Sequence, residues 1–145
     1  MKANSRRTKT PTVSAKRFKQ GDRLPVQAQR IWQILTAFVM FAPHGSRPRK
    51  VMPYGDLAVL MGYADRRAGH MLGRQLGIVG HFCVANDLPP LNTIVINEAT
   101  GMPGDEVVVR PGRTVKEEQK AVASQDWFEI RPPTTGTLRQ IYETY

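Results

Sequence analysis

The stretch YGDLAVLMGYADRRAGHMLGRQL, residues 54–76, decides the fold that we expect, because it contains two helix signals separated by a turn. In its first half, apolar residues recur at helical spacing and Gly62 is a natural C-terminal stop. In its second half, Asp65 is placed to cap the next helix. The stretch therefore predicts a short helix, a turn and a longer helix.

The longer helix is expected to start at residue 65, to end before Asp87 and to have one apolar and one basic face. At about 100° per residue, the basic face consists of Arg66, His70, Gly73, Arg74, Gly77 and His81. A glycine inside a helix costs about 1 kcal/mol relative to alanine, so it needs a compensating reason. Close approach of a nucleic acid is one such reason. The alternative is a merely solvated basic helix, with Gly73 and Gly77 packing on another element.

The flanking segments extend this pattern to an α+β fold. Upstream, apolar residues at helical spacing predict a helix from Pro25 to Ala42, and Val51 with Met52 indicates a short strand. Downstream, residues 93–96 (TIVI) and 106–110 (EVVVR) predict the two strands of a hairpin. Three helices followed by a hairpin predict a small winged-helix domain with a β-hairpin wing.

A C-terminal helical extension is expected to pack on this domain. Residues 114–117 (TVKE) form a capping box for a helix that runs to about Ser124. Residues 127–130 (WFEI) predict a strand, with Trp127 and Phe128 expected in the core. Apolar residues between Leu138 and Tyr142 predict a terminal helix.

The N-terminal segment carries most of the net charge of +9. Residues 1–23 contain eight basic side chains and one acidic side chain, Asp22, a net charge of +7. Such a segment cannot offset its ordering entropy by burial, so we expect it to be disordered alone. An arm that neutralises phosphates is our interpretation, and a solubilising leader is the alternative. The expected organisation is a basic arm over residues 1–24, a winged-helix-like domain over 25–110 and the extension over 111–145.

Four segments, in this order, give the chain a distant resemblance to a known family. They are AQRIWQIL (28–35), VMPYGDLAVLMG (51–62), DRRAGHMLGRQL (65–76) and PLNTIVIN (90–97). Over about half of its length, the chain resembles the C-terminal domain of alkylguanine-DNA alkyltransferases and the inactive alkyltransferase-like proteins. The resemblance implies a winged helix that enters the minor groove, with Tyr54 beside the phosphate of an extruded nucleotide.

The resemblance also implies which chemistry is missing. Leu91 and Asn92 stand where the family has its alkyl-accepting cysteine and activating histidine, so alkyl transfer is excluded. The arginine that fills the vacated base stack in the family has three candidates here. Arg66, Arg67 and His70 each match it, depending on where two extra residues of this helix are placed.

No other catalytic, metal or cofactor site is expected from the residues. The three histidines lack a metal-ligand spacing, and the single cysteine, Cys83, lies on the apolar helix face and is expected in the core. A nuclease centre built from His81, Asp105 and Glu106 is the least favoured alternative.

We therefore expect a non-enzymatic DNA-binding protein, with duplex DNA favoured over single strands and RNA left open. Groove or base-edge contacts are assigned to Arg66, Arg67, His70 and Arg74, with Gly73 allowing close approach. Phosphate contacts are assigned to Tyr54, Arg47, Arg49 and Lys50, and in the arm to Arg6, Arg7, Lys16, Arg17 and Lys19.

The main alternative is a protein-interaction subunit or regulator of a larger nucleic-acid-processing complex. The predicted wing is locally acidic, which opposes contact with phosphate, so residues 105–145 would form the docking surface. Trp127, Phe128 and Tyr145 are its candidate anchors. The apolar stretches are too short for a membrane span, and no secretory signal is recognised, so we expect a cytoplasmic protein, associated with the nucleoid if bacterial.

Overall fold

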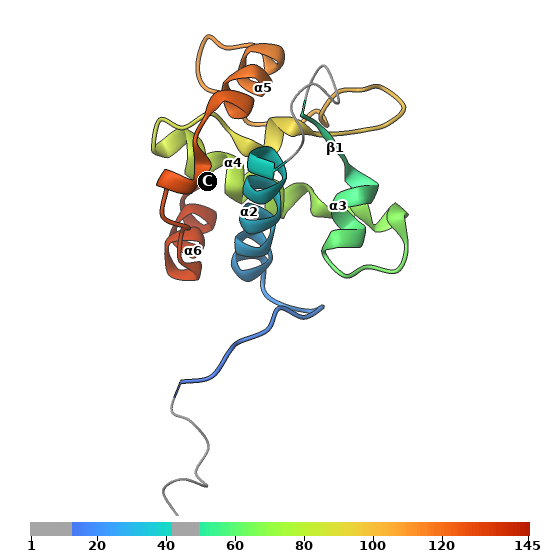
Figure 1. The fold of residues 1–145 in the computed structure, drawn as a ribbon, viewed down its shortest axis with the longest axis vertical. Coiled ribbons are helices and arrows are strands. Elements are labelled where there is room, and N and C mark those ends of the chain that lie inside the picture. Colours follow the sequence, from blue (N-terminus) through green and yellow to red (C-terminus); the bar gives the residue numbers. More distant parts are fainter. Residues whose placement is uncertain (1–12, 42–49) are drawn as a thin grey trace, which may run out of the picture.

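The computed structural model describes residues 13–41 and 50–145 of the chain. These residues form a helix-rich α+β fold around one central helix (Figure 1). The α-helices are α2 (Leu24–Phe41), α3 (Tyr54–Leu60), α4 (Gly73–Ala85), α5 (Val115–Ser124) and α6 (Thr135–Thr144). The 3-10 helices are η1 (Arg66–Leu72), η2 (Leu91–Ile94) and η3 (Trp127–Glu129), and the strands are β1 (Met52–Pro53) and β2 (Val95–Ile96).

Helix α2 is the centre of the hydrophobic core. Its apolar stripe is buried against α4 and α6, which confirms the helix predicted from Pro25 to Ala42 to within one residue at each end. Trp32 makes edge-to-face contacts with Phe82 of α4 at 5.4 Å and with Trp127 at 5.5 Å, measured between ring centroids. Such aromatic pairs add to the stabilisation from burial alone.

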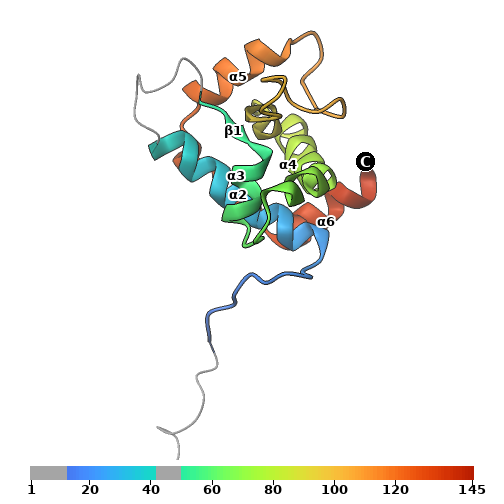
Figure 2. The ribbon, with the colours of Figure 1, turned by 90° about the vertical axis from the view of Figure 1, so that its right-hand side faces the viewer.

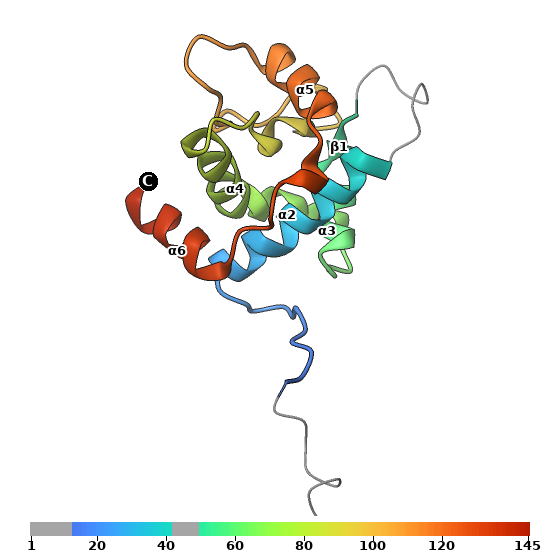
Figure 3. The ribbon, with the colours of Figure 1, turned by 60° about the vertical axis from the view of Figure 1, so that its left-hand side comes forward.

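The C-terminal elements belong to this same core. Figure 3 shows the chain running from α5 through η3 to α6 along one side of α2. Val122, Trp127 and Leu138 are all buried there, so Trp127 is a core residue as expected. The capping box at Thr114 and Glu117 is present and starts α5 at the predicted position.

The predicted strand at residues 127–130 is wrong. These residues form η3 because the Asp126 side chain accepts a hydrogen bond from the backbone N of Phe128 at 3.1 Å and so stabilises a tight turn. The turn directs Trp127 inward and leaves the Phe128 side chain 57% exposed. The expectation that Phe128 packs in the core is therefore wrong as well.

The predicted hairpin is also wrong. Strand β2 pairs in parallel with β1, Met52 opposite Val95 and Pro53 opposite Ile96, and the described residues contain no strand over 106–110. Residues 106–110 contact η2 instead of β2. With its amide oriented to satisfy both atoms, Asn92 pairs with the backbone N and O of Val108 at 2.8 and 3.3 Å. The loop then continues to α5 without a return strand.

The longer predicted helix is divided into two parts. Asp65 caps it as expected, with its side chain accepting from the backbone N of Arg67 at 2.8 Å. However, Arg66–Leu72 form the 3-10 helix η1, which turns by about 120° per residue, and the α-helix begins only at Gly73. The angular arithmetic of an α-helix therefore does not apply to Arg66 and His70. Among the described residues, no helix is long and apolar enough to cross a membrane.

Candidate nucleic-acid interface

A cavity of about 650 Å³ lies between residues 66–77, the segment to which groove contacts were assigned, and the loop that follows β2. Its walls come from the start of α3, from η1, from the first turns of α4, from Asn92 of η2 and from residues 97–98 and 104–107 of the loop. Tyr54, Arg66, Arg67, His70 and Gly73 all line it, so the fold brings together five residues that were assigned to nucleic-acid contacts. This volume is within the range of pockets that bind small ligands.

Two glycines of α4 keep one wall of this cavity free of side chains. A Cβ atom added at Gly77 would have no neighbour within 4 Å, and one added at Gly73 would meet only Glu106 Oε2 at 3.9 Å. Internal packing therefore does not require glycine at either position. At Gly77 the cost of a glycine inside a helix is left without a reason within the described residues, whereas Gly73 is the first residue of α4 and carries less of that cost.

Two other glycines of the same segment are needed for packing. A Cβ at Gly69 would lie 2.6 Å from the backbone of Tyr54, and a Cβ at Gly80 would lie 2.6 Å from the Asn92 side chain. Gly69 lets η1 approach α3. Gly80 lets α4 approach η2.

Tyr54 connects α3 to the loop. Its half-buried side chain packs against the core, and its hydroxyl oxygen accepts a hydrogen bond from the backbone N of Gly104 at 3.0 Å. Because the oxygen is used as an acceptor, the hydroxyl hydrogen is left to donate to a partner in the cavity. This geometry suits the contact with a phosphate that was assigned to Tyr54.

Arg66 is engaged within the protein. Its guanidinium donates to Asp56 in the first turn of α3 and to Glu98 in the loop. These hydrogen bonds raise the pKa of Arg66, Asp56 contributing most. No local pattern in the sequence indicates these contacts, because both carboxylates are distant from Arg66 along the chain.

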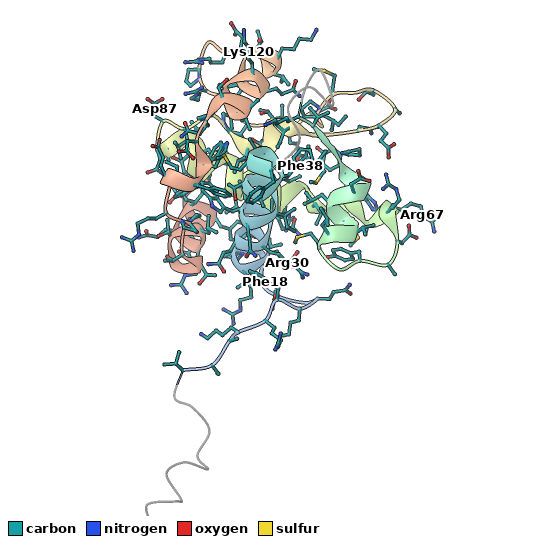
Figure 4. The ribbon with its side chains drawn as sticks, viewed as in Figure 1. Phe18, Arg30, Phe38, Arg67, Asp87 and Lys120 are labelled. Carbon is teal, nitrogen blue, oxygen red and sulfur yellow. The ribbon has the colours of Figure 1, made fainter. Side chains whose placement is uncertain are left out.

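Arg67 and His70 are exposed next to it. The Arg67 guanidinium pairs with its own helix cap, Asp65, at 2.8 Å, and its side chain is 89% exposed and projects from the molecule (Figure 4). The hydrogen bond from Arg67 lowers the pKa of Asp65. The Nδ1 atom of His70 contacts the carbonyl oxygen of Arg67, so that nitrogen carries the proton and a neutral His70 has Nε2 as an acceptor.

The remaining predicted contacts are spread over other surfaces. Arg74 is exposed on α4 but does not line the cavity. Lys50 donates from Nζ to the carbonyl oxygen of Val39 at 2.8 Å and so caps the C-terminal end of α2. His81, placed on the basic face by the sequence, stacks on Tyr145 at 4.6 Å between ring centroids, away from the cavity.

The arm is joined to the body by contacts that sequence reasoning missed. Arg30 of α2 lies over the ring of Phe18 at 5.4 Å, and Gln20 donates to the carbonyl oxygen of Gly62 at 2.8 Å (Figure 4). Lys16, Arg17 and Lys19 are exposed beside this junction, where the chain leaves the N-terminal end of α2 (Figure 2). Arg6, Arg7, Arg47 and Arg49 lie outside the described residues.

The nuclease alternative does not gain a centre from the fold. Asp105 and Glu106 line the cavity, whereas His81 lies against α6. Among residues 13–41 and 50–145, no group of three His, Cys, Asp or Glu side chains is arranged to hold a metal ion. Cys83 is fully buried, as expected, and burial raises the pKa of its thiol to about 12. A thiol with this pKa is not a nucleophile at neutral pH.

Comparison of the chain with protein-family models, with curated proteins and with solved structures gives no match.

Proposed function

We propose that this chain is a non-enzymatic DNA-binding protein that contacts a duplex through residues 65–77 and through its basic N-terminal arm. The observation that carries the proposal is the open wall formed by Gly73 and Gly77. Both residues lie in the first turns of α4, where an added Cβ would fit without displacing other atoms. A partner whose backbone or base edges approach the helix closely gives the missing reason.

Charge supports the same proposal. Arg67, His70 and Arg74 are exposed around the glycines, and the arm adds a net charge of +7 over residues 1–23. Basic side chains that neutralise phosphates supply affinity without sequence preference, while contacts to base edges supply specificity. In this proposal the arm has the first role and the segment beside the cavity has the second.

The finer fold class is part of the proposal. Helix α2, helix α3 and the segment formed by η1 and α4 serve as the three helices of a winged helix, and the loop over residues 97–110 takes the place of the wing. In the resemblance to alkyltransferase-like proteins, the cavity beside Tyr54 is the site of the extruded nucleotide. Alkyl transfer is not proposed, because Leu91 and Asn92 supply neither a thiol nor a base. A DNA partner favours the cytoplasm, and the nucleoid in a bacterium.

A second candidate function rests on a different surface. Phe41 and Phe128 are 75% and 57% exposed, and their ring centroids are 5.4 Å apart. Exposed aromatic pairs are common anchors of protein interfaces, which supports a subunit or regulator of a larger complex. Copurification from the native host with wild-type protein and with Phe128→Ser tests this candidate. A partner retained equally by both proteins would contradict a role for this pair.

Salt-titrated binding to a labelled duplex, with single-stranded DNA and RNA as competitors, tests the main proposal. We expect duplex binding that weakens steeply as salt rises, because released counterions make the affinity depend on salt. We also expect duplex competitors to displace the probe better than single strands do. Absence of duplex binding at low salt would contradict the proposal.

A further inference from the structure

Arg66 joins parts of the candidate interface that are far apart in the sequence. It donates from Nη1 to Asp56 of α3 and from Nη2 to Glu98 of the loop, and it lines the cavity. Its side chain lies against the backbone of Gly55, where an added Cβ would be 2.9 Å from the guanidinium carbon. The guanidinium therefore bridges η1, α3 and the loop along one wall of the cavity.

The loop has a second, stronger attachment at its other end. Arg110 donates to Glu118 of α5 at 2.7 Å, and the Glu118 side chain is 0% exposed and that of Arg110 only 13%. The backbone N of Arg110 donates to the same carboxylate at 2.9 Å. In contrast, the side chains of Arg66 and Glu98 are 49% and 64% exposed. Exposed ion pairs contribute little to stability and exchange easily, so the Glu98 end is the one that can release.

We propose that Asp56 and Glu98 form an acidic latch that occupies Arg66 in the free protein, and that a DNA phosphate displaces Glu98 when DNA binds. The displacement rests on the proposed function, since DNA supplies the phosphate. A guanidinium binds carboxylate and phosphate with the same forked geometry, so the two compete for it. With both carboxylates in place the cluster of three charges is net negative, and it repels a phosphate.

Release of Glu98 has a structural consequence for the loop. Between the latch and Arg110, the hydrogen bond from Gly104 N to the Tyr54 hydroxyl also holds the loop against α3. Once Glu98 is free, the part of the loop near Gly104 moves away from α3, while its C-terminal end stays on α5. DNA binding through Arg66 is thereby coupled to opening of the cavity.

The first experiment measures duplex affinity at low salt for wild type and Glu98→Gln. The variant keeps the size of the side chain and removes its charge, and we expect affinity to rise about threefold, the scale of one exposed ion pair. Asp105→Asn is the matched control, because it removes a carboxylate from the same cavity wall without touching Arg66. We expect a clearly smaller rise for this control.

An Arg66→Gln background separates the latch from general repulsion between carboxylates and DNA. If the latch exists, Glu98→Gln in the Arg66→Gln background should raise the duplex affinity by no more than Asp105→Asn does. An equal rise in both backgrounds would overturn the proposal. Weaker binding by Glu98→Gln would overturn it too, since Glu98 would then be positioning Arg66 for DNA.

A second experiment tests the latch in the protein without DNA, by amide hydrogen exchange. Hydrogen exchange at the Gly104 amide is expected to be several-fold faster in Glu98→Gln, while the Arg110 amide, bonded to Glu118, stays unchanged. Unchanged exchange at Gly104 would mean that no latch holds the loop, even if the protein binds DNA. If no variant binds DNA, the proposed function and the displacement both fail, and exchange at Gly104 still decides whether the latch exists.

Discussion

Gly69 and Gly80 differ from Gly73 and Gly77 in what surrounds them, although all four occur in one continuous segment. The first pair faces backbone or side-chain atoms at 2.6 Å, so η1 and α4 can pack only if those positions lack a side chain. The second pair faces the cavity, with nothing closer than 3.9 Å. The packing of the protein therefore requires the first two glycines, whereas it does not require the other two, for which we propose a role in binding a partner.

The largest expected effect comes from the packed pair. We expect Gly69→Ala to reduce the free energy of unfolding by about 3 kcal/mol, because its Cβ would collide with the Tyr54 backbone, which cannot move aside. Urea denaturation checks this result. The control is Gly77→Ala, which we expect to be neutral or to gain up to about 1 kcal/mol from helix propensity. If Gly69→Ala and Gly77→Ala had the same free energy of unfolding, the packed glycines would not differ from the open ones.

Deletion of residues 1–17 tests whether charge, and not only close approach, supports binding. The deletion removes six basic and no acidic side chains and spares Phe18 and Gln20, which contact the body. We expect weaker binding to all sequences alike. The slope of log K against log salt should become shallower by up to about 5, at about 0.9 per phosphate. The melting temperature should stay constant. An unchanged slope would show that the arm is only a leader.

The smallest expected effect concerns the side of α4 that packs on α6. Burial lowers the pKa of His81 from its ordinary value of 6.5, so the folded protein holds this ring neutral more strongly than the unfolded chain does. Its contribution to stability is therefore complete above about pH 6.5 and falls as the pH drops through the lowered pKa. We expect a small loss of unfolding free energy at acidic pH.

The control for this pH effect is His81→Phe, which keeps a ring for stacking on Tyr145 but does not titrate. Unfolding is measured by urea at about pH 5 and about pH 8, on either side of the ordinary histidine pKa. The difference in stability between the two pH values should be smaller in the variant. A difference of the same size in both proteins would place the titration elsewhere.

Local patterns in the sequence predicted the parts of the fold that are determined locally. The periodicity of α2, the capping box at Thr114 and the stop at Gly62, which has a φ of 91°, are all confirmed. The hairpin was not predictable in this way. Asn92 binds the backbone of Val108, and Glu118 binds Arg110, so contacts with other parts of the chain override the strand propensity.

The candidate site shows the same division. The basic segment over residues 65–77 and its glycines could be found from spacing and composition. The position of Glu98 beside Arg66 depends on a loop whose path the sequence did not indicate, and the close approach of η1 to α3 depends on the contact between Gly69 and Tyr54. The basic face expected from α-helical periodicity therefore lost His81, and Arg74 does not line the cavity, while the carboxylates of the loop joined the site.

Duplex binding by Gly73→Leu tests the central claim most directly. Leucine favours a helix more than glycine does and has open space at this position, so the melting temperature should hold or rise slightly. The matched control is Gly136→Leu at an exposed position near the start of α6, where an added Cβ would meet only Thr134 Oγ1 at 3.8 Å. Fluorescence anisotropy should show affinity for the duplex falling about tenfold or more for Gly73→Leu, the loss of one good base contact, and remaining unchanged for Gly136→Leu. Normal duplex binding by Gly73→Leu, with a melting temperature several degrees lower, would show that this face packs inside the protein and would contradict the claim.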